Sequence, residues 1–433
     1  GSLHFRNRFV RTKGFVEELA ADKMLYKGQF SLKPGGWLAN AFDTRVKNVA
    51  NTNVLHWGRR LFALWEAGKP TEVDALNLAT LGESSFGGAL AGNENFTAHP
   101  RYDAGTGRLV GFYYEPNPLL SKTKVVFFEF GAQGFGLENR IEHDLPGFGF
   151  FHDFIVTQRF YVLSKAPTAI SSQKGLLAVA GLRSFGEALA FDASKPSQLV
   201  IVPRDGSPVM TVDVDTHFCF HFANGFEVDD ELVVDMVRVN ELYLGEDSAE
   251  TRMPVWESTD MTSLPISKLW RYTVSLDTRK WSKRSLCDRY LDFPSIARRL
   301  SGKPYRYVYC SCGAAEETSA PVQGLVKVDV EAGSTVGLWL PEEHEFLGEP
   351  VFCPRPGHEA EDAGYVISWL VNGRDRTSEL LVFDAQDVGR GPISRLRLST
   401  FIPYGLHGCW APDVVPAWGD IEAAWRTVPT SLG

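Results

Sequence analysis

The sequence has no long hydrophobic run and no cluster of basic residues. No uninterrupted apolar stretch reaches about 18 residues, so a transmembrane helix is not expected. The 433 residues carry a net charge of −9 without a run of lysine or arginine, which argues against nucleic acid as a partner. We therefore expect a protein that is soluble or attached to a membrane only at its surface.

Cysteine is also scarce, and its placement argues against a disulfide scaffold. The six cysteines are scattered, and only Cys310 and Cys312 lie close together in the sequence. An isolated Cys-x-Cys pair is weak evidence for a metal site, whereas scattered thiols are typical of reduced intracellular proteins. No signal peptide is recognisable, so we expect an intracellular location, in the cytoplasm or a plastid.

Long helical patterns are few, and short β-rich segments dominate. Runs of Val, Ile, Phe and Tyr separated by Gly, Pro, Asp and Asn predict short strands joined by turns. The predicted strands are Arg8–Thr12, Val54–Trp65, Leu109–Tyr114, Lys124–Phe130, Phe154–Leu163, Gln198–Pro203, Leu269–Ser275, Tyr305–Tyr309, Leu325–Val330, Tyr365–Leu370 and Leu380–Phe383. Two segments suit helices, Lys174–Phe185 and Glu227–Asn240, although the valines of the second also suit a strand.

This pattern predicts an all-β fold. Many short strands with turns between them are typical of a sandwich, a barrel or a propeller. The chain length favours a β-propeller, in which roughly 40 to 60 residues form each four-stranded blade. The 29 phenylalanines and 11 tryptophans indicate a large aromatic interior or a hydrophobic cavity.

Four of the ten histidines share a setting of aromatic, glycine or proline neighbours in apolar segments: His99, His152, His221 and His407. Their spacings correspond to about one blade, one blade with an insertion and about three blades. Because the inner strands of a propeller surround one axis, residues distant in sequence can meet there. Four imidazoles would suit Zn, Cu, Fe or Ni. The alternative for each is a hydrogen-bonded core histidine, and His217 competes with His221.

Three acidic residues in apolar segments are candidates to orient such ligands. They are Glu66, Asp292 and Glu349. An imidazole that binds a metal usually donates its other N–H to a carboxylate or a carbonyl, and carboxylates also offset the charge of the metal. The alternative for each is a carboxylate in a surface turn.

At these residues the sequence resembles the carotenoid cleavage oxygenases, a family that also includes stilbene-cleaving enzymes and retinoid isomerases. The resemblance extends from about Arg6 to His407. It is carried by Asn7–Thr12, Ala63–Pro70, Leu78–Gly82, Phe96–Asp103, His152–Thr157, His221–Glu227, Gly348–Pro354 and Tyr404–Gly408. It implies a single domain, residues 1–433, that folds as a seven-bladed β-propeller with a helical and loop dome over the metal-bearing face.

The resemblance also implies the contents of the site. It implies one Fe(II) per chain on the four histidines, the three carboxylates behind them, and O2 as co-substrate. Thr52 resembles a family threonine near an open metal position, and Phe151 and Phe220 are candidate substrate-pocket residues, with core packing as the alternative. Two departures stand out. The family usually has Glu where this chain has Asp292, and a His-Trp-Phe-Asp-Gly-Asp-Gly-Met-type segment that usually precedes Arg8–Thr12 is expected to be missing.

The implied activity is cleavage of one double bond of a carotenoid or apocarotenoid into two carbonyl products. The alternatives are a retinoid-type isomerohydrolase, a stilbene-cleaving oxygenase and a non-catalytic propeller that binds an apocarotenoid or a partner. Because polyenes partition into membranes, a peripheral membrane contact is expected. Lys174–Phe185 has an apolar cluster flanked by basic residues, as an interfacial helix has, and a dome helix packed on the propeller is the alternative.

Overall fold

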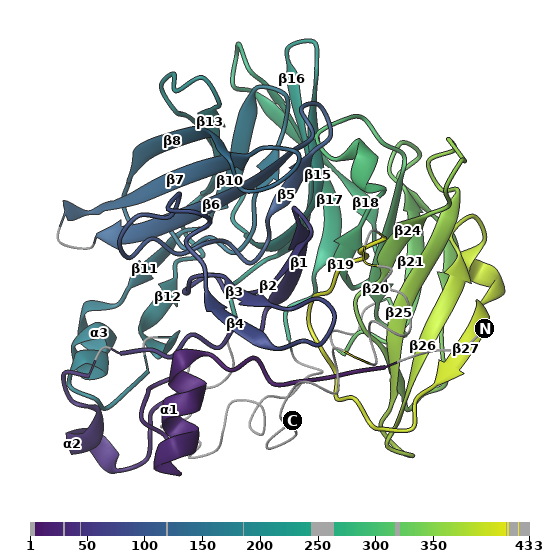
Figure 1. The fold of residues 1–433 in the computed structure, drawn as a ribbon. Helices are drawn as coiled ribbons and strands as arrows, with labels where there is room; N and C mark the ends of the chain where they lie inside the picture. The colour runs from purple at the N-terminus through teal and green to yellow at the C-terminus, as the bar shows by residue number, and fades with distance from the viewer. Residues whose placement is uncertain are drawn as a thin grey trace.

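The computed structural model describes residues 5–28, 31–43, 45–117, 120–184, 186–243, 264–316, 321–412, 414 and 423. Six antiparallel sheets of four or five strands follow one another along this part of the chain (Figure 1). The first sheet consists of β1 (Asn53–Trp57), β2 (Arg60–Leu64), β3 (Thr71–Val73) and β4 (Thr80–Glu83). The second consists of β5 (Arg101–Asp103), β6 (Arg108–Asn117), β7 (Lys122–Phe130) and β8 (Leu137–Pro146). The third consists of β9 (Ile155–Val156), β10 (Phe160–Lys165), β13 (Ser197–Pro203) and β14 (Met210–Val214).

The remaining three sheets repeat this antiparallel arrangement. The fourth consists of β15 (Phe218–Val228), β16 (Glu231–Val239), β17 (Lys268–Ser275) and β18 (Trp281–Cys287). The fifth consists of β19 (Leu291–Ser295), β20 (Tyr307–Cys312), β21 (Gly324–Asp329) and β22 (Ser334–Trp339). The sixth contains β23 (Glu345–Leu347), β24 (Val351–Pro354), β25 (Gly364–Asn372), β26 (Thr377–Asp384) and β27 (Pro392–Arg397), and both β23 and β24 pair with β25.

Apolar side chains fill the space between each sheet and the next. Five hydrophobic clusters in the described residues join the first sheet to the second, the second to the third, and so on to the sixth. Strands that bury both faces appear in the sequence as continuous apolar runs, such as Phe160–Leu163 in β10. The predicted all-β propeller is confirmed, with six blades in the described residues where seven were expected.

The described residues before β1 contribute helices instead of a blade. Thr12 caps α1 (Lys13–Ala21) by accepting a hydrogen bond from the Phe15 amide at 3.4 Å, so the strand predicted at Arg8–Thr12 does not form. This segment also contains α2 (Gly36–Asn40), which gathers with α3 (Ser172–Val179) and the β11–β12 hairpin on one side of the sheets (Figure 1). The hairpin strands are Thr168–Ile170 and Leu189–Phe191, and short 3₁₀ turns span Gly186–Ala188, Arg298–Leu300 and Val388–Arg390.

The two helices that the sequence suggested have different outcomes. Of the first, Lys174–Val179 lies in α3, which begins at Ser172, the helix ends before Ala180, and Phe185 lies outside the described residues. The segment Glu227–Asn240 is not a helix, because its β-branched valines pair along β15 and β16 around a turn at Asp229, where φ is 52°. No helix in the described parts of the chain is long and apolar enough to cross a bilayer.

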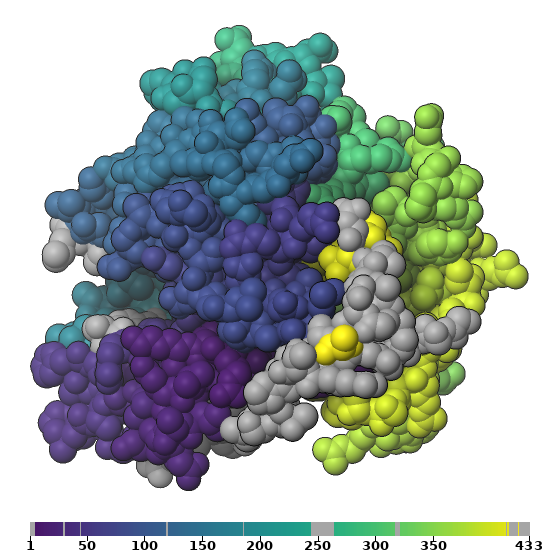
Figure 2. All heavy atoms as spheres, viewed as in Figure 1, coloured from purple at the N-terminus to yellow at the C-terminus, as the bar shows by residue number. Residues whose placement is uncertain are grey.

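The segment after β27 links the sixth sheet to the first. Ser378 Oγ donates to the carbonyl of Ile402 at 2.9 Å, and Tyr404 Oη donates to the carbonyl of Leu347 at 3.0 Å. Further along, the amide of His407 donates to the carbonyl of Thr52 at 3.2 Å, beside β1. The yellow atoms of this segment accordingly lie between the dark blue and the green sheets in Figure 2. This crossing carries His407 toward the strands that hold the other three histidines.

The competing histidine, His217, is part of the core. It is fully buried, its Nδ1 donates to the carbonyl of Asp215 at 2.8 Å, and its Nε2 accepts from Ser164 Oγ at 3.0 Å. Burial lowers the pKa of His217 from 6.5 to about 4, so the folded protein holds this ring neutral.

The low pKa of His217 predicts an acid-dependent loss of stability. Between the unfolded value of 6.5 and the folded value of about 4, the unfolded chain binds a proton that the folded chain does not, so stability falls as pH falls. We expect this histidine to remove about 2 kcal/mol of unfolding free energy between pH 7 and pH 5. Urea unfolding of wild type and His217→Asn at both pH values measures this loss of unfolding free energy. An equal loss in the two proteins would refute the assignment to His217.

Candidate metal centre

Each of the four histidines comes from a different segment next to the first strand of a sheet. His99 lies just before β5, His152 lies just before β9, and His221 lies within β15. His407 arrives on the segment that crosses from the sixth sheet to β1. The spacing argument made from the sequence therefore matches the structure, because the first strands bring residues far apart in the chain to one place.

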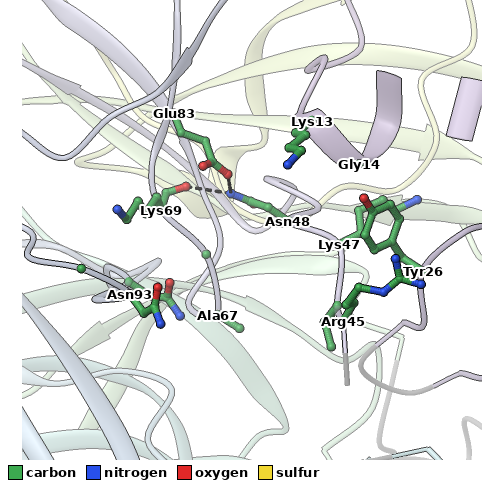
Figure 3. A pocket seen from close by; sticks show the side chains of 14 residues that line it. Lys13, Gly14, Tyr26, Arg45, Lys47, Asn48, Ala67, Lys69, Glu83 and Asn93 are labelled. Atoms are coloured by element: carbon green, nitrogen blue, oxygen red, sulfur yellow. Dashed lines mark hydrogen bonds between the residues drawn. The ribbon is translucent and has the colours of Figure 1, made fainter. Parts of the chain in front are cut away.

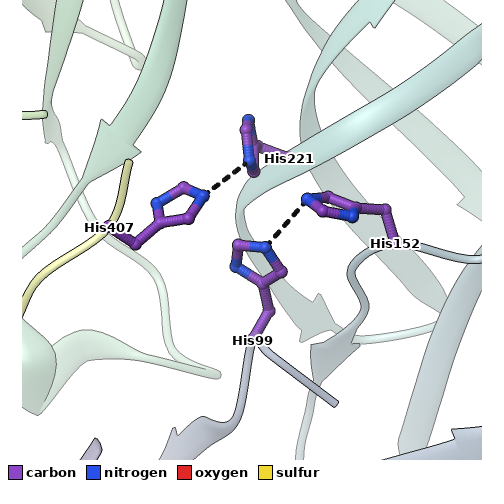
Figure 4. A group of neighbouring side chains, drawn as sticks. All are labelled: His99, His152, His221 and His407. Atoms are coloured by element: carbon purple, nitrogen blue, oxygen red, sulfur yellow. Dashed lines mark hydrogen bonds between the residues drawn. The ribbon is translucent and has the colours of Figure 1, made fainter. Parts of the chain in front are cut away.

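The four imidazoles point toward a common centre (Figure 4). Their Nε2 atoms lie 3.0 Å apart between His99 and His152 and 3.2 Å apart between His221 and His407. One nitrogen from each of the four rings lies within 4.8 Å of the others. Nitrogens bound about 2.1 Å from one ion, at right angles to each other, would lie about 3 Å apart, so the group fits a single metal.

Carboxylates contact the outward nitrogens of three rings. Asp292 Oδ1 accepts from His221 Nδ1 at 2.7 Å, and Glu349 Oε1 accepts from His407 Nδ1 at 2.8 Å. Glu66 Oε1 lies 3.4 Å from His152 Nδ1. A carboxylate at Nδ1 selects the tautomer that leaves the Nε2 lone pair free for a metal. Each of the three acidic residues chosen from the sequence thus lies beside one of the four imidazoles.

Burial and mutual contacts set the protonation of this group. Burial, followed by the neighbouring imidazoles, holds the pKa of His99 well below its ordinary value, which keeps the ring neutral and able to bind a metal. Burial alone would raise the pKa values of Glu66 and Asp292, but their histidine partners outweigh it and leave both pKa values below the ordinary range. A divalent cation at the centre would offset two of the three carboxylate charges.

Asp292 reaches His221 directly because the backbone bends at this point. The pairing of β19 with β20 shifts register between Asp292 and Ser295, and Phe293 adopts a left-handed conformation with φ of 56°. The amide of Phe293 donates to Asp292 Oδ1 at 2.8 Å and holds the carboxylate in place. No bridging group is needed for the shorter side chain to reach the imidazole.

The other predicted pocket residues separate into two groups. Thr52 Oγ1 lies 3.5 Å from Glu66 Oε2, and the Phe220 ring meets the His152 ring edge-on at 5.6 Å between centroids. Phe151, in contrast, is 2 % exposed and packs edge-on against Tyr114 in the core between the second and third sheets. Its place next to His152 in sequence does not bring its ring to the centre, because the ring packs into this core instead.

One aromatic residue at the site was not identified from the sequence. The ring of Phe293 lies 5.4 Å from that of His221 and 5.3 Å from that of His407, measured between centroids. Its position directly after Asp292 was the available signal, but the left-handed backbone that turns it toward both imidazoles could not be read from residue types.

Two cavities border residues that neighbour the centre in sequence. One of about 360 Å³ borders Pro100 and Gly408, the chain neighbours of two of the histidines. The other, about 620 Å³, lies between α1 and the turn that follows Glu66, and is lined largely by charged and amide side chains (Figure 3). Asn48 Nδ2 there donates to the carbonyl of Lys69 at 2.8 Å, and a side chain at Gly68 would collide with Asn48. Asn48 therefore holds the turn after Glu66 in place. The lining of this second cavity is too polar to favour a hydrocarbon chain.

Comparison with known proteins identifies similar chains over nearly the whole sequence. A family model described as retinal pigment epithelial membrane protein matches residues 1–412. Apocarotenoid-15,15'-oxygenase of a Synechocystis strain is 39% identical over 417 residues, which cover 95% of this chain and 83% of that protein. Lignostilbene-alpha,beta-dioxygenase isozyme III of Sphingomonas paucimobilis is 28% identical over 95% of this chain and 84% of its own length.

A solved structure supports the same relationship. The crystal structure of a cobalt-substituted Synechocystis enzyme matches with a TM-score of 0.88 and 37% identity, over 93% of this chain and 83% of that one. The cobalt in that protein is consistent with a metal-binding site in this fold.

Proposed function

Because this chain belongs to the carotenoid cleavage oxygenase family, we propose that it is an Fe(II)-dependent dioxygenase that cleaves one double bond of a carotenoid or apocarotenoid. The observation that carries the proposal is the convergence of four imidazoles, three of them backed by carboxylates. Imidazole is a common ligand of iron, and four protein ligands leave coordination positions open in an octahedral geometry.

The roles of the protein groups follow from their contacts. Bound Fe(II) would supply the electron donation and open positions that O2 activation requires. His99, His152, His221 and His407 hold the metal, and the carboxylates fix the direction of three of these rings. In the overall reaction the carbon–carbon double bond breaks and each carbon takes one oxygen atom of O2. No further reductant is needed.

The surroundings of the centre suit an apolar substrate. Phe220 lies against His152, and Phe293 lies against His221 and His407. Such rings exclude water and favour a hydrocarbon chain, whereas no acid–base pair is needed because the metal and oxygen carry the chemistry. A polyene held beside these rings would place a double bond near the open coordination positions.

Oxygen uptake and product analysis test this proposal. Protein loaded anaerobically with Fe(II), then aerated with detergent-dispersed apocarotenals and carotenoids, is expected to consume one O2 for each double bond cleaved and to release two carbonyl products. Absence of carbonyl products from the whole panel would contradict the proposal. Conversion without oxygen uptake would favour an isomerohydrolase instead. The relatives are named as oxygenases, which argues against a non-catalytic propeller.

We further propose that the protein takes its substrate from a membrane surface through an apolar patch on α2 and α3. The two segments are joined by a hydrogen bond from the Phe42 amide to the carbonyl of Val179 at 2.9 Å. The patch, called here the α2–α3 patch, consists of the exposed side chains of Trp37, Leu38, Phe42, Leu176, Val179 and Leu182. A contiguous group of large exposed apolar residues is a typical sign of a membrane or protein contact.

Replacing two leucines of the α2–α3 patch is expected to weaken vesicle binding. Leu38 is 74 % exposed and Leu176 is 71 % exposed, so both can enter the lipid interface without unfolding the protein. Loss of each from the bilayer should reduce partitioning by at least about tenfold. Co-sedimentation of Leu38→Glu/Leu176→Glu with phosphatidylcholine–phosphatidylglycerol vesicles measures the effect, with Ile393→Glu on β27 as a control. Equal binding by the double variant and the control would refute the membrane contact.

A further inference from the structure

A buried ion pair lies one or two residues in sequence from two of the four histidines. Arg101 follows His99 by two residues, and Asp153 directly follows His152. The Arg101 guanidinium contacts both oxygens of the Asp153 carboxylate, through Nε at 3.2 Å and through Nη2. The Asp153 side chain is 1 % exposed and that of Arg101 is 21 % exposed, so the pair is largely withdrawn from solvent.

The same pair binds the backbone of the third ligand segment. Asp153 Oδ2 accepts from the amide of Phe222 at 2.8 Å, and Arg101 Nη2 donates to the carbonyl of Phe222 at 2.9 Å. Phe222 directly follows His221 on β15, the first strand of its sheet, between two register shifts. The ion pair thus supplies the hydrogen bonds that a neighbouring strand would supply at this free edge, at the point where β15 bulges.

His99 has the greatest need for such support. Within the described part of the chain, His152, His221 and His407 have carboxylates at Nδ1, and no carboxylate contact is found at Nδ1 of His99. Its position is set through the backbone instead. The His99 amide donates to Thr97 Oγ1 at 2.9 Å, and Arg101 Nε, two residues on, donates to the carbonyl of Phe154 at 2.8 Å.

We propose that Arg101 and Asp153 are positioning residues for the metal centre. Together they fix the backbones that carry His99, His152 and His221 relative to one another, and they do for His99 what carboxylates do for the other three rings. The pair has no net charge, so it joins the three segments without altering the charge beside the metal. This inference rests on the metal centre of the proposed function, but not on the substrate.

The hydrogen bonds of Asp153 make an isosteric replacement informative. Every group that contacts its carboxylate is a donor: Nε and Nη2 of Arg101 and the amides of Phe154 and Phe222. In Asp153→Asn the new NH2 group would face donors whichever way it turned, so at least one contact is lost. Arg101→Lys keeps the positive charge but removes the fork that reaches two segments at once.

Cobalt binding tests the proposal without substrate or oxygen. Metal-free protein is titrated with Co(II) against a competing chelator, and the visible absorption of bound Co(II) reports the ligand geometry. We expect Asp153→Asn to bind Co(II) about 10- to 100-fold more weakly than wild type. Arg101→Lys is expected to bind several-fold more weakly, with an altered cobalt spectrum in both variants. Thermal unfolding of the metal-free proteins identifies conditions in which each is folded, and Arg101→Lys serves if Asp153→Asn does not fold.

The control is a second buried Arg–Asp pair away from the histidines. Arg271 binds Asp235 through two hydrogen bonds of 2.7 Å, and Asp235 is fully buried. Arg271→Lys should lower thermal stability while the affinity and the spectrum of Co(II) stay as in wild type. Folded Asp153→Asn and Arg101→Lys proteins with wild-type affinity and spectrum would overturn the positioning role, and so would equal weakening in the control. Wild type that binds no Co(II) would refute the metal centre itself.

Discussion

His407→Ala is expected to lose its metal. Wild type should hold about one iron per chain after anaerobic loading with Fe(II). The variant should bind iron more than about 100-fold more weakly, because losing a ligand costs more affinity than losing a residue that only hydrogen-bonds to a ligand. The reason is that the ring supplies one of four nitrogens and forms the link between the C-terminal segment and the other three ligands. Metal analysis after gel filtration gives the stoichiometry, and cleavage activity should fall with the iron content.

The control for this variant is an exposed histidine outside the centre. His358→Ala removes an imidazole from the surface and should leave the iron content unchanged. The alanine at position 407 keeps its amide, which still donates to the carbonyl of Thr52, so the fold should survive. An iron content in His407→Ala equal to that of wild type would show that the four histidines do not act as one site.

Asp292→Glu is expected to weaken metal binding, although the family resemblance of the sequence implied Glu at this position. The Asp292 carboxylate already lies 2.7 Å from His221 Nδ1, and an added methylene would lengthen the side chain by about 1.5 Å. The longer side chain must fold back or displace the imidazole, since the amide of Phe293 fixes one oxygen. We expect iron affinity to fall by about tenfold, measured by competition with a chelator.

The reciprocal change at Glu349 provides the comparison. Its longer side chain spans both His407 Nδ1, at 2.8 Å, and the amide of Gly408, at 2.7 Å. Glu349→Asp should therefore also weaken binding, because the shorter side chain cannot keep both contacts. If Asp292→Glu bound iron as tightly as wild type, the claim that the bent β19 backbone requires a short carboxylate at this position would be wrong.

The residues of the centre could be predicted because they combine polar chemistry with an apolar setting. Each of the four histidines is an imidazole in a segment that must be buried, and their spacing follows the length of a blade. The carboxylates were recognised for the same reason. His217 shows the limit of this argument, since it has a similar setting but is satisfied by Ser164 and a backbone carbonyl.

Other features depend on tertiary contacts that residue types do not encode. The valines near β16 suit a helix or a strand, and the pairing with β15 and β17 decides in favour of a strand. Phe154–Leu163 was predicted as one strand but divides into β9 and β10 at a turn. Arg101 and Asp153 look like ordinary surface charges in the sequence. They form a buried ion pair only because three segments meet around them.

X-ray absorption spectroscopy of the Fe(II)-loaded wild-type protein tests the central claim most directly. The claim is that four imidazoles from distant segments bind one iron. It predicts an iron edge whose extended fine structure carries the multiple-scattering pattern of four histidine rings, with nitrogens at about 2.1 Å. A spectrum that fits two or fewer imidazoles, or an iron surrounded by oxygen ligands alone, would contradict the four-histidine centre and the oxygenase mechanism derived from it.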